Sequence, residues 1–116
     1  MAAHNDTGRH GEKLAVDYFI NKDYEILHKN WRESHWEVDI IAAKNGILHF
    51  IEVKTKTTNK YGFPEDEVSR SKIKFMINSA EAYLFLYPQW QRIQFDILAI
   101  VLKPRLSVFL IEDVYI

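Results

Sequence analysis

Apolar side chains recur at helical spacing in two stretches of the chain. The first stretch carries them at Leu14, Ala15, Tyr18 and Phe19. It predicts a helix that begins at Asp6 or Thr7 and ends near Asn21. The second stretch carries them at Ile73, Met76, Ile77, Ala80, Tyr83 and Leu84. It predicts a long helix that starts near Ser69 and that Pro88 ends.

Elsewhere the apolar residues form short runs or alternate with polar ones, which is typical of strands. The five predicted strands are roughly Tyr24–His28, Trp36–Ala43, Ile47–Lys56, Arg92–Leu102 and Leu106–Glu112. Asn45-Gly46 separates the second strand from the third and is a strong signal for a tight hairpin. The sequence therefore predicts an α/β fold in the order αβββαββ, with a mixed sheet flanked by helices.

Composition supports one compact domain over residues 1–116, because 47% of the residues are hydrophobic and 14% are aromatic. The chain has no cysteine, which excludes disulfides and thiolate metal sites. Its N-terminus is polar, and no apolar run reaches the length of a membrane span. We therefore expect a cytoplasmic protein without a membrane partner. The net charge of -1 argues neither for nor against a polyanionic substrate.

The hairpin gathers four ionisable side chains. With Asn45-Gly46 as a two-residue turn, Asp39 lies opposite Glu52 and Glu37 lies opposite Lys54. Because side chains alternate along a strand, all four project from one face of the sheet. A slip of one residue would destroy this arrangement.

Two carboxylates that face each other across a strand pair repel, and here their neighbours are apolar. A bound cation or a shared proton offsets such a conflict. Mg²⁺ is satisfied by one or two carboxylates together with waters and a substrate phosphate. Lys54 would then hold the attacking water or stabilise charge that develops on the phosphate. The alternative is a surface hairpin whose Asp39, Glu52 and Lys54 form ordinary cross-strand ion pairs.

Two further acids lie close to this constellation. Glu12 lies at the flank of the apolar stripe of the first helix, so a helix packed on the sheet would aim it at the metal. Alternatively, Glu12 is a first-turn acid that is stabilised by the helix dipole. Glu37 is given a supporting role, either as an ion-pair partner of Lys54 or by orienting it.

Basic residues bracket the hairpin in the sequence, and we expect them to contact a phosphate backbone. They are Lys56, Lys60, Arg70 and Lys72. The alternative is a solvated charged face that Glu65, Asp66 and Glu67 interrupt. The three tryptophans are expected to pack rather than to stack on bases. The five histidines show no metal-ligand spacing and are given no role.

Asp39 followed by Glu52-Val53-Lys54 resembles the D…(D/E)-x-K signature of restriction-endonuclease-like nucleases. More closely, the chain is similar to the YraN-like family of small bacterial proteins in that superfamily. The resemblance lies in Gly8–Ala15, Asn30–Arg32, Glu37–Ala42, Phe50–Lys56, Tyr61–Pro64, Lys72 and Phe95-Asp96. Two positions depart from many members of the family: Trp36 replaces a glycine and Gln94 replaces an arginine.

The resemblance implies a nuclease core and hydrolysis of phosphodiester bonds that depends on Mg²⁺ or Mn²⁺. It implies that Asp39, Glu52, Glu12 and the backbone carbonyl of Val53 are metal ligands and that Lys54 is the catalytic lysine. We therefore expect an endonuclease that acts on DNA rather than RNA, with branched or structured DNA as a substrate class. One alternative is a weakly active or inactive module that binds nucleic acid or scaffolds a complex; another is a protein-interaction domain. A homodimer also stays open.

Overall fold

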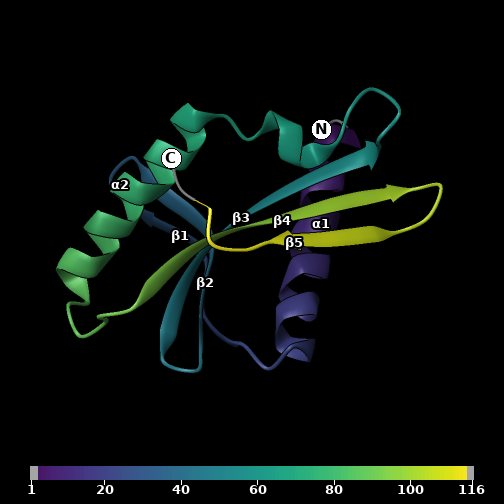
Figure 1. Ribbon diagram of the computed structural model, residues 1–116. Helices are drawn as coiled ribbons and strands as arrows, with labels where there is room; N and C mark the ends of the chain where they lie inside the picture. The colour runs from purple at the N-terminus through teal and green to yellow at the C-terminus, as the bar shows by residue number, and fades with distance from the viewer. Residues whose placement is uncertain (1–2, 115–116) are drawn as a thin grey trace.

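The computed structural model describes residues 3–114 and confirms the predicted order of elements, with one short addition. The helices and strands are α1 (Ala3–Asn21), β1 (Glu25–Glu33), β2 (Trp36–Lys44), β3 (Ile47–Thr58), the 3-10 helix η1 (Pro64–Glu67), α2 (Arg70–Leu86), β4 (Ile93–Lys103) and β5 (Ser107–Ile111). Figure 1 shows them as one twisted sheet flanked by two helices. Within residues 3–114, neither helix has the length and apolarity that a membrane crossing requires.

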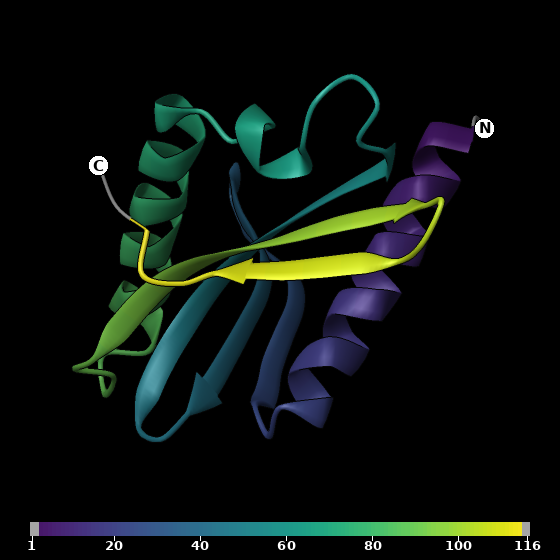
Figure 2. The same cartoon turned by 45° about the vertical axis from the view of Figure 1, so that its right-hand side comes forward.

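The five strands lie in the order β1-β2-β3-β4-β5. Neighbouring strands are antiparallel except β3 and β4, which are parallel. A parallel pair requires a crossover, and η1 and α2 supply it. Figure 2 shows α1 and α2 on opposite sides of the sheet, with η1 near the end of β3. This crossover brings the start of α2 to the end of β3, where the candidate site lies.

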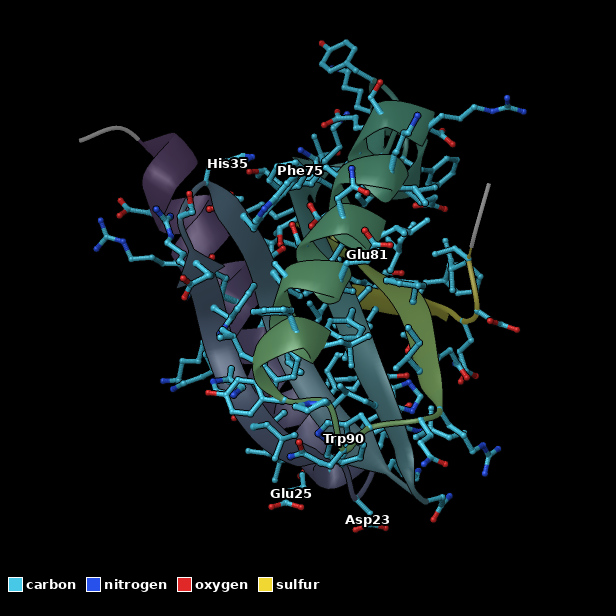
Figure 3. All side chains as sticks on the ribbon, turned by 90° about the vertical axis from the view of Figure 1, so that its left-hand side faces the viewer. Asp23, Glu25, His35, Phe75, Glu81 and Trp90 are labelled. Atoms are coloured by element: carbon cyan, nitrogen blue, oxygen red, sulfur yellow. The ribbon has the colours of Figure 1, made fainter. Side chains whose placement is uncertain are left out.

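Each helix covers one layer of apolar core. Ala15 and Phe19 of α1 pack in a layer with Ile40, Ala42, Ile51, Leu98 and Ile100. Ala80 and Tyr83 of α2 pack in the other layer with Trp31, Val38, Ile41, Leu48 and Phe50. Figure 3 views α2 from its outer side, on which Glu81 is exposed. The two layers fix both helices against the sheet, so a side chain on either helix has a defined place relative to the strands.

The turn between β2 and β3 has the predicted form. Asn45 and Gly46 have φ values of 53° and 78°, as a two-residue hairpin turn requires. Lys44 pairs with Ile47, and the predicted register is confirmed as far as Ile40 opposite Ile51.

The first helix begins earlier than the sequence predicts. Asp6 and Thr7 lie inside α1 rather than at its cap, and Asp6 supplies the acid of the first turn. Glu12 lies in the middle of the helix. The alternative in which the helix dipole explains Glu12 is therefore wrong, because the dipole acts within the terminal turns. The predicted start of α2 is confirmed, since Ser69 Oγ accepts a hydrogen bond of 3.1 Å from the backbone N–H of Lys72.

Two strands are longer than the sequence predicts. β1 continues to Glu33 rather than ending at His28, because a register shift between Ile26 and His28 resets its pairing with β2 and buries Trp31. β3 continues to Thr58 because the parallel pairing with β4 supports it to its end. The stretch between β3 and α2, for which the sequence predicts no helix or strand, contains η1, in which Pro64 lies in the first turn.

Candidate active site

Strands β2 and β3 separate beyond Ile40 and Ile51, and we call this point the fork. Val38 packs in the α2 layer and Ile40 packs in the α1 layer, although residues two apart on a regular strand share a face. The alternation is therefore broken at Asp39. The expected continuous ladder that pairs Asp39 directly with Glu52 is wrong in this respect, because the described pairing ends one residue earlier.

The fork turns the backbone of Val53 toward Asp39. The Val53 N–H donates a hydrogen bond of 2.8 Å to Asp39 Oδ2, in place of a bond to the β2 backbone. The N–H and carbonyl of one strand residue point to the same side. The Val53 carbonyl therefore also faces the fork, on the side of Asp39.

Asp39 and Glu52 form a desolvated pair of carboxyl groups at the fork. The Glu52 side chain is only 12% exposed. Burial, and then the neighbouring Asp39, raise the pKa of Glu52 to about 8. Burial also raises the pKa of Asp39, against the opposing effects of the Val53 N–H and the Lys72 ammonium. Without a cation, the two groups are held in a site that disfavours two negative charges.

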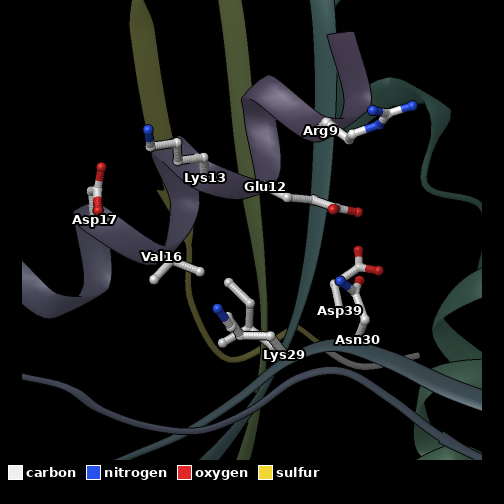
Figure 4. Close-up of a pocket in the computed structure, with 9 residues that line it drawn as sticks. Arg9, Glu12, Lys13, Val16, Asp17, Lys29, Asn30 and Asp39 are labelled. Carbon is white, nitrogen blue, oxygen red and sulfur yellow. The ribbon is translucent and has the colours of Figure 1, made fainter. Parts of the chain in front are cut away.

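Glu12 reaches the same site from α1. Asp39, Glu52 and Glu12 line one hollow of about 440 Å³. Figure 4 shows the Glu12 side chain directed toward Asp39. The helix can approach β3 this closely because residue 11 is a glycine: a Cβ there would lie 2.8 Å from Thr55 Cβ. Gly11 therefore sets the distance between the Glu12 helix and the strand that carries Glu52.

The two lysines of β3 are held by an acid of η1. Lys54 Nζ lies 3.2 Å from Glu67 Oε1, and Lys56 Nζ lies 2.6 Å from Glu67 Oε2. The expected ion pair of Lys54 with Glu37 is absent from the described residues. Glu37 instead pairs at 3.3 Å with Arg32 on β1, because the fork carries β2 away from the end of β3.

Lys72 lies in the site rather than on its approach. Its Nζ is 3.7 Å from Glu52 Oε2, so of the four basic residues assigned to a phosphate backbone it is the one that contacts the carboxylate pair. Among the other three, Arg70 is exposed, Lys60 lies over the Tyr61 ring and Lys56 contacts Glu67. The helix start predicted near Ser69 already placed Lys72 in the first turn of α2. The sequence did not show that this turn points toward Glu52.

The donor set is compatible with Mg²⁺ or Mn²⁺ but is not a closed metal site. Among the side chains that the structure describes, residues 6–114, no three His, Asp or Glu converge closely enough to hold an ion by themselves. Mg²⁺ does not need such a cage, since it retains waters and takes one or two carboxylates with substrate phosphate oxygens. Asp39, Glu52 and the Val53 carbonyl meet this requirement. The desolvated charges of the two carboxylates favour the binding of a cation.

The raised pKa of Glu52 predicts that metal affinity depends on pH. The folded, metal-free protein retains a proton on Glu52 between about pH 4.5 and 8, whereas the unfolded chain has lost it. The stability that this proton provides is therefore lost as the pH rises through about 8. Metal binding must displace the proton, so we expect Mg²⁺ affinity to increase with pH, by at most about tenfold per unit, up to pH 8.

Calorimetric titration of Mg²⁺ in buffers of different ionisation enthalpy measures this effect. Close to one proton is expected to be released per ion bound at pH 7. In Glu52→Gln, any residual Mg²⁺ binding should lose most of this proton release. A wild-type affinity that stays constant from pH 6 to 8 would contradict the assignment of Glu52.

Both positions that depart from the YraN-like pattern lie outside this site. Gln94 Nε2 donates a hydrogen bond of 2.9 Å to Asp96 Oδ1, and Asp96 Oδ2 lies 2.7 Å from His49 Nδ1. No role was expected for His49 from the sequence, but it is part of this buried polar network between β3 and β4. Trp36 packs against Phe75 of α2, with ring centroids 5.2 Å apart. Trp36 therefore contributes to the packing of β2 against α2.

Comparison with known proteins agrees with the motifs. The model of the "Uncharacterised protein family UPF0102" matches residues 11–100, which include every acid and lysine described above at the fork. The UPF0102 protein BF0634 of Bacteroides fragilis is 43% identical over 103 residues, which cover 89% of this chain and 85% of the relative. FP2501 of Flavobacterium psychrophilum is 40% identical over 100 residues, covering 86% and 84%. A UPF0102 protein of Parabacteroides distasonis is 38% identical over 114 residues, covering 98% and 93%. The chain therefore belongs to the UPF0102 family, the YraN-like family whose motifs it carries.

Proposed function

We propose that the protein is a metal-dependent endonuclease that hydrolyses phosphodiester bonds in DNA, including branched or structured DNA. The observation that carries this proposal is the desolvated Asp39–Glu52 pair at the fork, with the ammonium group of Lys72 beside it. A pair of acids with raised pKa values beside a lysine, at the wall of an open hollow, is typical of a catalytic site. A structural ion-pair network would instead balance its charges.

Asp39, Glu52, the Val53 carbonyl and Glu12 are the groups that would hold Mg²⁺ or Mn²⁺. When bound, the ion lowers the pKa of a water molecule and neutralises phosphate charge. Asp39 is held for this task by the Val53 N–H, which fixes its Oδ2. Glu12 completes the oxygen set from the α1 side of the hollow.

The two lysines have separate tasks in this proposal. Lys72 lies 3.7 Å from Glu52 and keeps the carboxylate pair from being wholly uncompensated before a substrate binds. Lys54 lines the same hollow and stabilises the charge that develops on the attacked phosphate. For this, a substrate phosphate has to replace Glu67 as the partner of Lys54. This replacement exchanges one anion for another. It costs little free energy, because Glu67 is exposed and an exposed ion pair is weak.

Titration of Mg²⁺ and of Mn²⁺ into the wild-type protein and Asp39→Asn tests the proposal. The substrates are single-stranded, duplex, flapped and four-way-junction DNA, with RNA of the same sequence. We expect metal-dependent cleavage of DNA by the wild type and its loss in Asp39→Asn. Equal cleavage by the two proteins would overturn the assignment of the site.

A catalytically weak or inactive module that binds nucleic acid is the second candidate. The observation in its favour is that Glu67 holds both Lys54 and Lys56 and thus opposes their contact with phosphate. Binding of metal through Asp39 together with DNA binding, but with no cleavage of any substrate, would favour this candidate over the nuclease.

A further inference from the structure

The candidate site lies in the middle of a longer groove. The hollow at the fork shares Arg9, Glu12 and Asp39 with a second hollow of about 470 Å³ along α1. It shares Thr7, Lys54 and Thr55 with a third hollow of about 390 Å³ beside the loop after β3. Because neighbouring hollows share walls, they form one continuous path, which we call the α1 groove. The carboxylate pair lies near the midpoint of this path.

The two ends of the α1 groove differ in chemistry. At the end along α1, Lys13 of the helix and Lys29 of β1 line the wall, and both are exposed. Figure 4 shows both residues beside this hollow. At the other end lies Tyr61, whose side chain is 82% exposed. Lys60 Nζ lies 5.5 Å from the centroid of the Tyr61 ring. One end thus presents two lysines together with Asp17, and the other presents an aromatic ring with a cation beside it.

We propose that the α1 groove binds an unpaired polynucleotide strand, with backbone phosphates on Lys13 and Lys29 and a base stacked on Tyr61. This inference rests on the proposed function and names its substrate class as single-stranded DNA or an unpaired segment of a structured DNA. A cationic groove combined with an exposed aromatic ring is the arrangement by which proteins bind single strands. A paired base is already stacked within a duplex and does not present its face to a side chain.

The α1 groove also explains how the phosphates of a strand reach the carboxylates at the fork. Cations at both ends of the groove attract the strand, although Asp17 lines one end hollow and Glu67 the other; the three carboxylates proposed to hold metal gather in its middle. The strand is therefore anchored on either side of the bond that lies over Asp39 and Glu52. Gly62 has a φ of 122°, which glycine adopts readily, and it shapes the loop from which Tyr61 projects.

Binding of fluorescent oligo(dT) and of a blunt duplex, each with EDTA and again with Ca²⁺, tests the inference without requiring turnover. We expect tighter binding of oligo(dT) than of the duplex. Tyr61→Ala is expected to weaken oligo(dT) binding by roughly 5- to 150-fold, while Tyr61→Phe retains it, because stacking needs the ring alone. Phe85→Ala is the matched control, since Phe85 is 86% exposed on α2 outside the groove.

The lysine end has its own variant. Lys13→Gln combined with Lys29→Gln is expected to reduce the slope of log affinity against log salt by about 1.4 for oligo(dT), at about 0.7 per phosphate lost. Lys74→Gln, on the exposed side of α2, should leave the slope unchanged. Tighter binding of the duplex, or full affinity in Tyr61→Ala, would overturn this inference and leave the proposed nuclease intact. Failure to bind either probe under any condition would contradict both.

Discussion

Glu52→Gln is expected to abolish metal-dependent DNA cleavage and also to make the metal-free protein more stable. The amide cannot supply the negative charge that the ion needs, so the cleavage rate should fall by more than about 100-fold. The same change removes a buried carboxyl group whose pKa is raised to about 8. Above pH 8 the wild type must carry that charge in a desolvated site, and the variant is free of this cost. Because a pKa of about 8 in place of 4.5 corresponds to about 1.4 kcal/mol per pKa unit, we expect its free energy of unfolding to exceed the wild-type value by up to about 5 kcal/mol at pH 9.

Urea unfolding with EDTA at pH 5 and pH 9, together with single-turnover cleavage, measures both effects. The stability difference should fall below about 1 kcal/mol at pH 5, which is close to the pKa of Glu52 in the unfolded chain. Glu81→Gln is the control, because Glu81 is exposed on the outer side of α2 (Figure 3) and should change neither quantity. A Glu52→Gln protein that is less stable than the wild type at pH 9 would show that Glu52 has a structural role rather than a metal-binding one.

Gly11→Ala is expected to destabilise the protein although alanine favours helices. A Cβ at this position would lie 2.8 Å from Thr55 Cβ and 2.9 Å from Thr55 Cγ2, so α1 and β3 must move apart. Overpacking of this kind costs about 1–3 kcal/mol, and the gain in helix propensity of about 1 kcal/mol offsets only part of it. Because α1 carries Glu12, the displacement should also weaken metal-dependent cleavage.

Gly8→Ala provides a control on the same helix. No atom lies within 4 Å of a Cβ placed at Gly8, so this change should stabilise the protein by up to about 1 kcal/mol in urea unfolding. In a double-mutant cycle, Thr55→Gly should relieve part of the cost of Gly11→Ala, because it removes the three atoms nearest to the new methyl group. Equal effects of Gly8→Ala and Gly11→Ala would show that α1 does not pack this closely on β3.

The β2–β3 hairpin shows how much of the structure can be predicted from the sequence. The Asn45-Gly46 turn fixes the register through local backbone geometry, so the pairing of Ile41 with Phe50 could be counted from the turn. The count brought Asp39 and Glu52 together correctly, although it assumed a ladder that continues past them. Where the strands separate depends on how Val38 and Ile40 are divided between the two helical layers. That division is a property of packing between distant segments, and alternation along one strand does not contain it.

The side chains around the carboxylate pair show the same limit to prediction from the sequence. The sequence identified Lys54 but assigned it Glu37 as a partner, and it placed Lys72 on the approach to the site. In the structure Lys54 pairs with Glu67, and Lys72 pairs with Glu52. Both differences come from the crossover through η1 and α2, which returns to the end of β3. A helix pattern predicts that a crossover exists, but not over which strand end its first turn lies.

By itself the sequence determined the order of the elements, the register of the hairpin and the family to which the chain belongs. These depend on contacts between near neighbours, on the period of apolar side chains and on motif residues that can be read in order. Only the tertiary structure decided that the strands separate at Asp39, that Glu67 and Lys72 are the charged neighbours of the site, and that Gly11 sets the depth of α1. Each of these results from packing between segments far apart in the chain, where burial and close contact outweigh local preference.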